Sequence, residues 1–184
     1  MPLGLKRNIV ELVDHDPKWK ESASQTIQQL WQTLGTVAKD IQHVGSTSIR
    51  HIKAKPMIDI AVAIDDFNEI EAISHAMESH GFSNRGWFSD GRMIFSIGED
   101  IAPDDRMTTH IIHIVKVGSK DWHDLADFRD YLNAHLPVAK AYEALKIKLA
   151  SEYPYDKGRK KYTDGKHDFI VQTLQDAALW LRQS

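Results

Sequence analysis

Apolar side chains recur every three or four residues from Trp19 to Leu34, which is the spacing of a helix that buries one face. Asp16 and Pro17 come just before this run and are residue types that favour the start of a helix. Gly35 follows the run, and glycine is common just past the end of a helix. The pattern therefore predicts an amphipathic helix that ends at Gly35.

An alternation with a period of two marks residues 57–64 as the best strand in the sequence. The even-numbered positions are all isoleucine or valine, whereas the odd-numbered positions include Asp59 and two alanines. Since successive side chains of a strand point to opposite faces, this strand should have one bulky apolar face and one face of smaller residues that carries Asp59. Less regular segments predict further strands at residues 9–13, 36–44, 92–97 and 109–117.

Helical spacing dominates the last third of the chain, where three helices are predicted around residues 122–132, 138–149 and 169–181. An earlier helix is expected to open at Asp65 and Asp66 and to stop near Gly81. Residues 98–107 hold several acids and are predicted to form a loop between two strands. Because strands and helices are segregated along the chain, the predicted fold class is α+β with a helical C-terminal portion at about residues 119–184.

Composition narrows the class of protein. The 184 residues, of which 42% are apolar and 27% charged, suit one ordinary globular domain over residues 1–184. A net charge of -3 gives no global basic field, so we expect no nucleic-acid partner. The absence of cysteine excludes disulfides, thiolate nucleophiles and cysteine-based zinc sites. No apolar run suits a signal peptide or approaches the ~20 residues that cross a bilayer, so we expect a cytoplasmic protein without a membrane partner.

The first candidate for chemistry is the turn Gly-Ser-Thr-Ser, which begins at Gly45 and follows a predicted strand. Glycine allows the backbone to approach a ligand closely. The backbone N–H groups and the hydroxyl groups of Ser46 and Ser48 can then surround phosphate oxygens. Such turns are common, so the turn indicates a phosphate site only in combination with other residues.

The second candidate is Asp59, which lies inside an apolar strand. A carboxylate in that setting is costly unless it meets a cation, a hydrogen-bond donor or open solvent. A strand carboxylate beside a Gly-Ser turn is the arrangement that holds Mg²⁺ against a triphosphate. The alternative is an aspartate near the end of a strand that is bonded to the backbone or to Lys55.

Two runs around these candidates, at residues 41–48 and 54–60, resemble the signature of the GrpB family. Residues 109–115 resemble the histidine-rich strand of that family. Further similarity extends over most of the chain, at residues 10–19, 128–132, 142–146, 162 and 166–170. No single motif is decisive, but their order and spacing together are specific.

The resemblance implies a nucleotidyltransferase-like fold, in which a mixed β-sheet flanked by helices carries the Gly-Ser turn and a metal-binding carboxylate. Working members of that wider superfamily hold two metal ions with two acids on one strand and a third on a neighbouring strand. This chain has Asp59 but carries Ala61 two residues later, and it has no acid at residues 109–115. Two-metal nucleotidyl transfer is therefore in doubt, and a single Mg²⁺ or Mn²⁺ on Asp59 and His113 is the remaining expectation.

His113 is expected to act with Asp59, as a metal ligand or in acid–base catalysis, mainly because of the resemblance. His110 should project to the opposite face of the same strand, and the alternative for either histidine is a hydrogen-bonded structural role. Basic side chains on the family-like runs are expected to neutralise phosphate charge, unless they only pair with nearby acids. These are Lys55, Arg129, Lys146 and Lys166.

Two hypotheses of different classes follow for the function. In the first, an enzyme binds a nucleoside triphosphate or another phosphate-bearing small molecule and transfers a nucleotidyl group to a small acceptor. In the second, a non-catalytic binding or chaperone-like module keeps the pocket but lacks the full acid set. Fusion of family members to dephospho-CoA kinase links this second hypothesis to coenzyme A metabolism. A third, a histidine-dependent hydrolase or transferase, would use another substrate in the same cleft.

Overall fold

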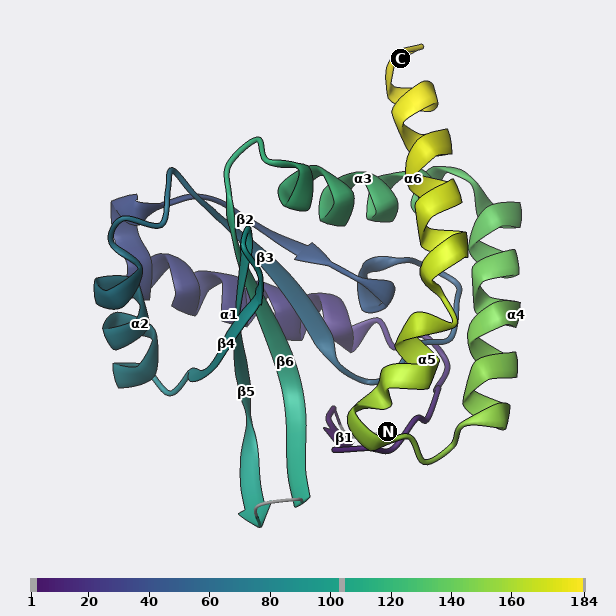
Figure 1. Ribbon diagram of the computed structural model, residues 1–184, viewed down its shortest axis with the longest axis horizontal. Helices are drawn as coiled ribbons and strands as arrows, with labels where there is room; N and C mark the ends of the chain where they lie inside the picture. Colours follow the sequence, from purple (N-terminus) through teal and green to yellow (C-terminus); the bar gives the residue numbers. More distant parts are fainter. Residues whose placement is uncertain (1–2, 103–104, 184) are drawn as a thin grey trace.

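The computed structural model describes residues 3–102 and 105–183, and its centre is a six-stranded sheet in the strand order β2-β3-β6-β5-β4, with β1 paired to β6 (Figure 1). Strands β3 and β6 are parallel, whereas every other pair is antiparallel. The mixed sheet is therefore confirmed. The strands are β1 (Leu5–Lys6), β2 (Ala38–Val44), β3 (Ile58–Ile64), β4 (Ser83–Ser89), β5 (Arg92–Ala102) and β6 (Asp105–Lys116).

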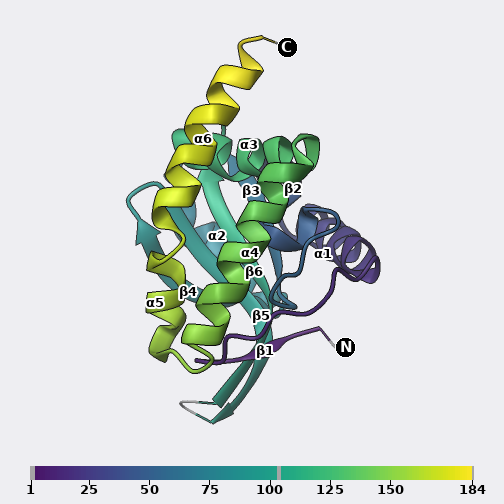
Figure 2. The ribbon, with the colours of Figure 1, turned by 90° about the vertical axis from the view of Figure 1, so that its right-hand side faces the viewer.

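Helices cover both faces of the sheet, and four of the six described α-helices follow the last strand. In Figure 2, α4, α5 and α6 stand together in front of the sheet, with α1 to one side. The expected α+β class with a helical C-terminal portion is therefore confirmed. The helices are α1 (Lys18–Leu34), α2 (Ile70–Ser79), α3 (Lys120–Ala134), α4 (Leu136–Glu152), α5 (Lys160–Asp164) and α6 (His167–Leu181). None of them is both long and apolar enough to cross a membrane.

The bulky face of β3 forms the main core. Its four even-numbered isoleucine and valine side chains are buried and pack with residues of α1 and α2, including Leu30 and Met77. The helix α1 ends where the sequence predicts, because Gly35 has φ +53° and its N–H donates to the Trp31 carbonyl. The start differs by one residue, because the helix begins at Lys18 with Pro17 as its N-cap, although a carboxylate oxygen of Asp16 accepts from the Lys18 N–H at 3.0 Å.

The opposite face of β3 carries small residues, as its odd-numbered positions predict. Ala61 and Ala63 pack with Val115 of β6 and Trp122 of α3 in a smaller core. Alanines there leave room for α3 to approach the sheet closely. Beyond this contact, α3, α4 and α6 pack on one another through a third apolar cluster that includes Phe128.

Several predicted elements differ from the observed ones. Residues 9–13 form only isolated bridges, from Ile9 to Tyr155 and from Val13 to Ala54, rather than an edge strand. The helix expected to open at Asp65 and Asp66 begins later, at Ile70, because an Asp66 carboxylate oxygen accepts from the Asn68 N–H in a turn at 2.8 Å.

The acidic stretch 98–107 was expected to be a loop, but β5 and β6 extend through most of it as a hairpin, with residues 103–104 lying outside the described residues. The strand β4 and the short helix α5 were not predicted. Because β4 is an edge strand with two register shifts and its last three residues are exposed, it has no regular alternation to read from the sequence.

Candidate functional site

A cavity of about 510 Å³ lies between the small-residue face of the sheet and the C-terminal helices. Its walls come from the turn after β2, from β3, β4, β5 and β6, and from α3 to α6. Six of the nine residues proposed from the sequence line it. These are Gly45, Ser46, Lys55, Asp59 and His113 on the strand side, and Lys166 joins them from the segment before α6 as a sixth.

Gly45 and Asp59 meet at the floor of this cavity. Val44, the last residue of β2, pairs with Asp59, and Gly45 follows with φ +70°, a left-handed conformation that favours glycine. A Cβ atom added to Gly45 would lie 2.4 Å from Oδ2 of Asp59. The turn can therefore pass over the carboxylate only because residue 45 has no side chain.

Asp59 also contacts His113, the histidine that the family resemblance led us to expect beside it. Oδ1 of Asp59 lies 3.3 Å from Nε2 of His113, and the two strands that carry them are parallel neighbours. His110 lies on the other face, where its Nε2 is 3.2 Å from the Ser22 hydroxyl of α1. Burial lowers the pKa of His110 to about 4, so that histidine is neutral at pH 7.

Lys55 and Lys166 place two ammonium groups at the same aromatic ring. Their Nζ atoms lie 4.9 Å and 4.6 Å from the ring centroid of Tyr162, and neither forms a hydrogen bond or ion pair within the described part of the chain. Burial, followed by repulsion from Lys166 and Arg159, lowers the pKa of Lys55 to about 7. Burial also lowers the pKa of Lys166 to about 8, although the Asp59 carboxylate counteracts this.

Lys146 lies beside the cavity rather than in its lining. Its side chain is 1% exposed, its Nζ donates to the Lys53 carbonyl at 2.5 Å, and the same atom lies 4.7 Å from the ring centroid of Tyr142. Burial and repulsion from Lys166 lower the pKa of Lys146 to about 7. Tyr142 does line the cavity, and its hydroxyl shares a hydrogen bond with Ser46, so it connects the Gly-Ser turn to α4.

Arg159 lines the cavity but was not among the residues proposed from the sequence. Its guanidinium donates to the carbonyls of Ile9 at 3.0 Å, Lys6 at 2.7 Å and Leu5 at 3.3 Å. It therefore ties the N-terminal segment to the start of α5, and it adds positive charge near Asp59. No local pattern in the sequence marks this role, because the carbonyls that Arg159 binds lie about 150 residues away.

Ser48 and Arg129 are not brought into this cavity. The Ser48 hydroxyl donates to the Gly45 carbonyl at 2.6 Å, which closes the turn. Nη1 of Arg129 donates to the His43 carbonyl at 2.9 Å, and its Nε pairs with Asp130 at 2.7 Å. Both residues line a second cavity of about 1060 Å³ on the far side of the turn, toward α1.

The donors present do not fit the two-ion arrangement of the wider superfamily. Within residues 3–102 and 105–183 no group of three or more histidine, aspartate or glutamate side chains is placed to hold a metal ion. Asp59 and His113 supply two donors, and the site of a second acid is Ala61 in a packed apolar cluster. Nδ1 of His113 is buried without a partner among the described residues, whereas metal-binding histidines usually donate their second N–H.

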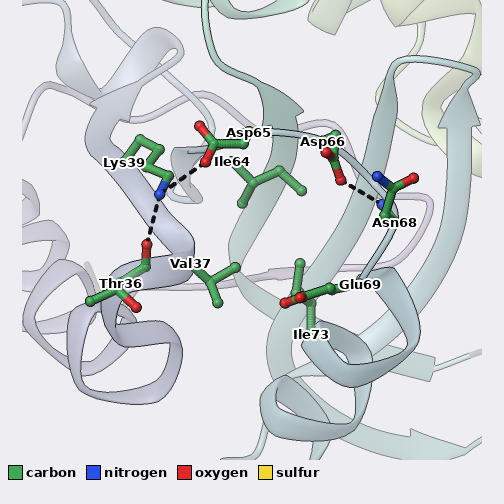
Figure 3. Close-up of a pocket in the computed structure, with 9 residues that line it drawn as sticks. All are labelled: Thr36, Val37, Lys39, Ile64, Asp65, Asp66, Asn68, Glu69 and Ile73. Carbon is green, nitrogen blue, oxygen red and sulfur yellow. Dashed lines mark hydrogen bonds and ion pairs between the residues drawn. The ribbon is translucent and has the colours of Figure 1, made fainter.

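Another group of acids lies at the far end of β3, around a cavity of about 330 Å³ (Figure 3). There an Asp65 carboxylate oxygen is 3.0 Å from Nζ of Lys39, which also donates to the Thr36 carbonyl at 3.1 Å. Asp66 is engaged by the Asn68 N–H. These acids begin a loop and pair with ordinary neighbours, and they lie at the opposite end of the strand from Asp59.

Comparison with known proteins identifies close relatives of the chain. A family model described as "GrpB protein" matches residues 9–176. The glutamate-rich protein GrpB of Alkalihalophilus pseudofirmus is 35% identical over 95% of this chain and 99% of its own length. The crystal structure of the conserved protein GrpB from Enterococcus faecalis has a TM-score of 0.77 and 28% identity, and covers 91% of this chain and 96% of its own. A structure of the Cid1 poly(U) polymerase has a TM-score of 0.45 and 13% identity, and covers 77% of this chain and 45% of its own.

Proposed function

The chain belongs to the GrpB family, and we propose that it binds a phosphate-bearing small molecule, with a nucleoside triphosphate as first candidate, in the cavity between its sheet and its C-terminal helices. The observation that carries the proposal is the pair of ammonium groups on Lys55 and Lys166. They converge on one ring of Tyr162, and neither is bound by a carboxylate among the described residues.

Two ammonium groups held away from bulk water are destabilising, because each loses hydration and each repels the other. The lowered pKa values of Lys55 and Lys166 express this cost. A phosphate group with two negative charges offsets both effects, since its oxygens accept hydrogen bonds from both ammonium groups. An apolar or cationic ligand would offset neither, so the charge of the cavity favours an oxyanion.

The Gly-Ser turn supports the same position for the phosphate. Ser46 places a hydroxyl group in the cavity wall, and Gly45, which also lines the cavity, lets the turn pass directly over the Asp59 carboxylate. Arg159 adds a third positive charge, although the carbonyls of the N-terminal segment already occupy its Nε and Nη2 donors. We therefore assign hydrogen bonding to the two lysines and to the turn, and long-range attraction to Arg159.

A second candidate function, group transfer, rests on the Asp59–His113 pair in the same wall. In such a step an acceptor hydroxyl oxygen attacks the α-phosphorus of the nucleotide, pyrophosphate leaves, and the hydroxyl proton passes to the Asp59–His113 pair. The pair can also offer two donors to one divalent ion, but the donor set does not fit two ions, so the proposal assigns no step to a metal. Binding without transfer is favoured by Ala61, which stands where a second acid would be.

The test is thermal unfolding of the full chain with ATP, GTP, CTP, UTP and inorganic tripolyphosphate, each in EDTA and in Mg²⁺. A ligand at 100 times its Kd stabilises by about 2.7 kcal/mol, which for a chain of this size raises Tm by roughly 5–10 °C. Lys55→Met and Lys166→Met should lose most of that increase. Lys160→Met, at an exposed position of α5, is the matched control and should keep it.

The proposal is wrong if no phosphate compound raises Tm, or if the Lys55 and Lys166 variants respond like the wild type. Pyrophosphate release then separates the two candidate functions. Release that depends on an added hydroxyl acceptor and disappears in Asp59→Ala supports transfer. Tight binding without release supports a binding module.

A further inference from the structure

Phe88 has the largest exposed fraction of the described large apolar side chains, 71%, and it lines the cavity. Single exposed apolar residues are ordinary on protein surfaces. Phe88 differs from those because it stands at the wall of the cavity whose other end carries the proposed phosphate site. Its ring therefore offers an aromatic surface to whatever enters the cavity.

Arg92 holds this ring from one side. The guanidinium carbon lies 5.5 Å from the ring centroid of Phe88, and Nη2 is fixed by an ion pair with Asp121 of α3. Nε of Arg92 is buried and has no partner among the described residues. The arginine thus positions the ring through a cation–π contact and keeps one donor uncommitted beside it.

A β-bulge sets the direction of Phe88. The pairing of β4 with β5 shifts register between Trp87 and Ser89, so the shift falls on Phe88. Such bulges re-aim a side chain. Trp87 turns the other way and packs edge-on against Phe67, with ring centroids 4.9 Å apart.

The aromatic end and the anionic end of the cavity lie on different strands. Asp59 and the neighbouring Gly-Ser turn belong to the β3 side, and Phe88 belongs to β4, with β6 and β5 between them. Three strand spacings of about 4.8 Å put these strands roughly 14 Å apart. A single phosphate does not reach both ends. A molecule that carries a flat ring at one end and a phosphate chain at the other does.

We propose that Phe88 and Arg92 form a subsite for a nucleobase, which stacks on the exposed surface of the Phe88 ring while the phosphates of the same nucleotide lie at Lys55 and Lys166. The inference rests on the proposed phosphate site and names the class of its ligand. Every base has a π-face, so stacking of this kind selects nucleotides over other phosphates more strongly than it selects one base over another.

The experiment is a calorimetric titration of the 184-residue chain with ATP, UTP and inorganic tripolyphosphate, in wild type, Phe88→Ala, Phe88→Tyr and Trp87→Ala. Loss of one stacking contact should raise the Kd for each nucleotide by roughly 5- to 150-fold. Phe88→Ala should therefore raise the Kd for both nucleotides by that factor and leave the Kd for tripolyphosphate within twofold of the wild-type value. Phe88→Tyr keeps a ring and should bind nucleotides like the wild type.

Trp87→Ala is the matched control, because it removes the adjacent aromatic residue of the same strand without touching the cavity lining. It should change none of the three affinities. If Phe88→Ala weakens the binding of tripolyphosphate as much as that of the nucleotides, or weakens the binding of neither, the proposed base subsite is wrong, but the proposed anion site is not contradicted. If wild type binds none of the three compounds, the proposed function fails, and the subsite fails with it.

Discussion

Three lysines at and beside the cavity should make the ligand-free protein more stable as the pH rises from 7 to 9.5. The pKa values of Lys55 and Lys146 are lowered from 10.5 to about 7, and that of Lys166 to about 8, with burial as the largest cause for each. In the unfolded chain all three titrate near their ordinary value of about 10.4. The folded protein therefore releases protons in a range where the unfolded chain keeps them.

Because the unfolded state binds more protons between pH 7 and 9.5, the free energy of unfolding rises with pH over that range. A difference of one proton changes it by ~1.4 kcal/mol per pH unit. The three groups repel one another, and a cavity open to water weakens the effect of burial, so we take one proton as the net difference. The expected increase is then about 3 kcal/mol across the range. Phosphate affinity should fall over the same range, because the ammonium groups that it needs are lost.

Urea denaturation at several pH values between 7 and 9.5 measures this slope directly. Lys55→Met should be more stable than the wild type at pH 7, because it removes a positive charge that repels Lys166 and Arg159. Its free energy of unfolding should also rise less steeply with pH, because one titrating group is gone. Lys160→Met, at an exposed position, should reproduce the wild-type slope. A wild-type stability that is flat or falls with pH, or an unchanged rise in Lys55→Met, would refute the reasoning.

Three further predictions concern other parts of the site. Burial lowers the pKa values of His43 and His110 to about 4, so the unfolded chain binds more protons between pH 6.5 and 4. Stability should fall as the pH drops through that range, and His110→Gln should reduce the fall in urea titrations. Gly45→Ala should lower the free energy of unfolding by about 3 kcal/mol or more, and Gly118→Ala by only about 1–2 kcal/mol. Both glycines have a positive φ, but only a Cβ at Gly45 would clash with another residue, Asp59. Equal losses of stability would contradict this reasoning. Arg159→Met should cost about 2–4 kcal/mol and speed hydrogen exchange at residues 5–9, because Arg159 binds the carbonyls of Leu5, Lys6 and Ile9. Unchanged exchange would exclude that role.

The chemistry of a single strand could be predicted from the sequence, because a period of two fixes which side chains share a face. That rule places Asp59 among small residues and separates His113 from His110, and the structure has both features. The meeting of Asp59 with His113 depends on the parallel pairing of β3 with β6, across 54 residues of chain. Local pattern contains no information about that register, so the resemblance to a family had to supply it.

Other parts of the site have no local signal. Phe88 belongs to an exposed edge strand with shifted pairing, so no alternation marks it. Arg159 is one of several basic residues in a short segment, and only its distant carbonyl partners set it apart. Arg129 lies on a family-like run, yet its guanidinium is bound by the His43 carbonyl and Asp130, and the residue lines the second cavity rather than the first. Side-chain direction on a helix follows from tertiary packing rather than from the motif that contains it.

Asp59 distinguishes the two ways in which the cavity can hold a phosphate. If a divalent ion on Asp59 and His113 bridges to the phosphates, removal of the carboxylate charge must weaken binding. If the lysines bind the phosphates directly, Asp59 competes with the ligand, because its charge already stabilises the ammonium group of Lys55 and raises its pKa. The two mechanisms therefore predict opposite signs for one substitution.

We expect Asp59→Asn to tighten tripolyphosphate binding about fivefold in EDTA, the equivalent of ~1 kcal/mol for a partly exposed charge. The same substitution should destabilise the ligand-free protein, since Lys55 and Lys166 lose the negative charge that raises their pKa values. Asparagine keeps the size of the side chain under Gly45, so the turn is not disturbed. Asp124→Asn also removes an acid from the cavity lining, but that acid is paired with Lys120, so it should change affinity less. If Asp59→Asn instead binds tripolyphosphate more weakly than the wild type, and only when Mg²⁺ is present, then the phosphate is bound through a metal ion held by the Asp59 carboxylate.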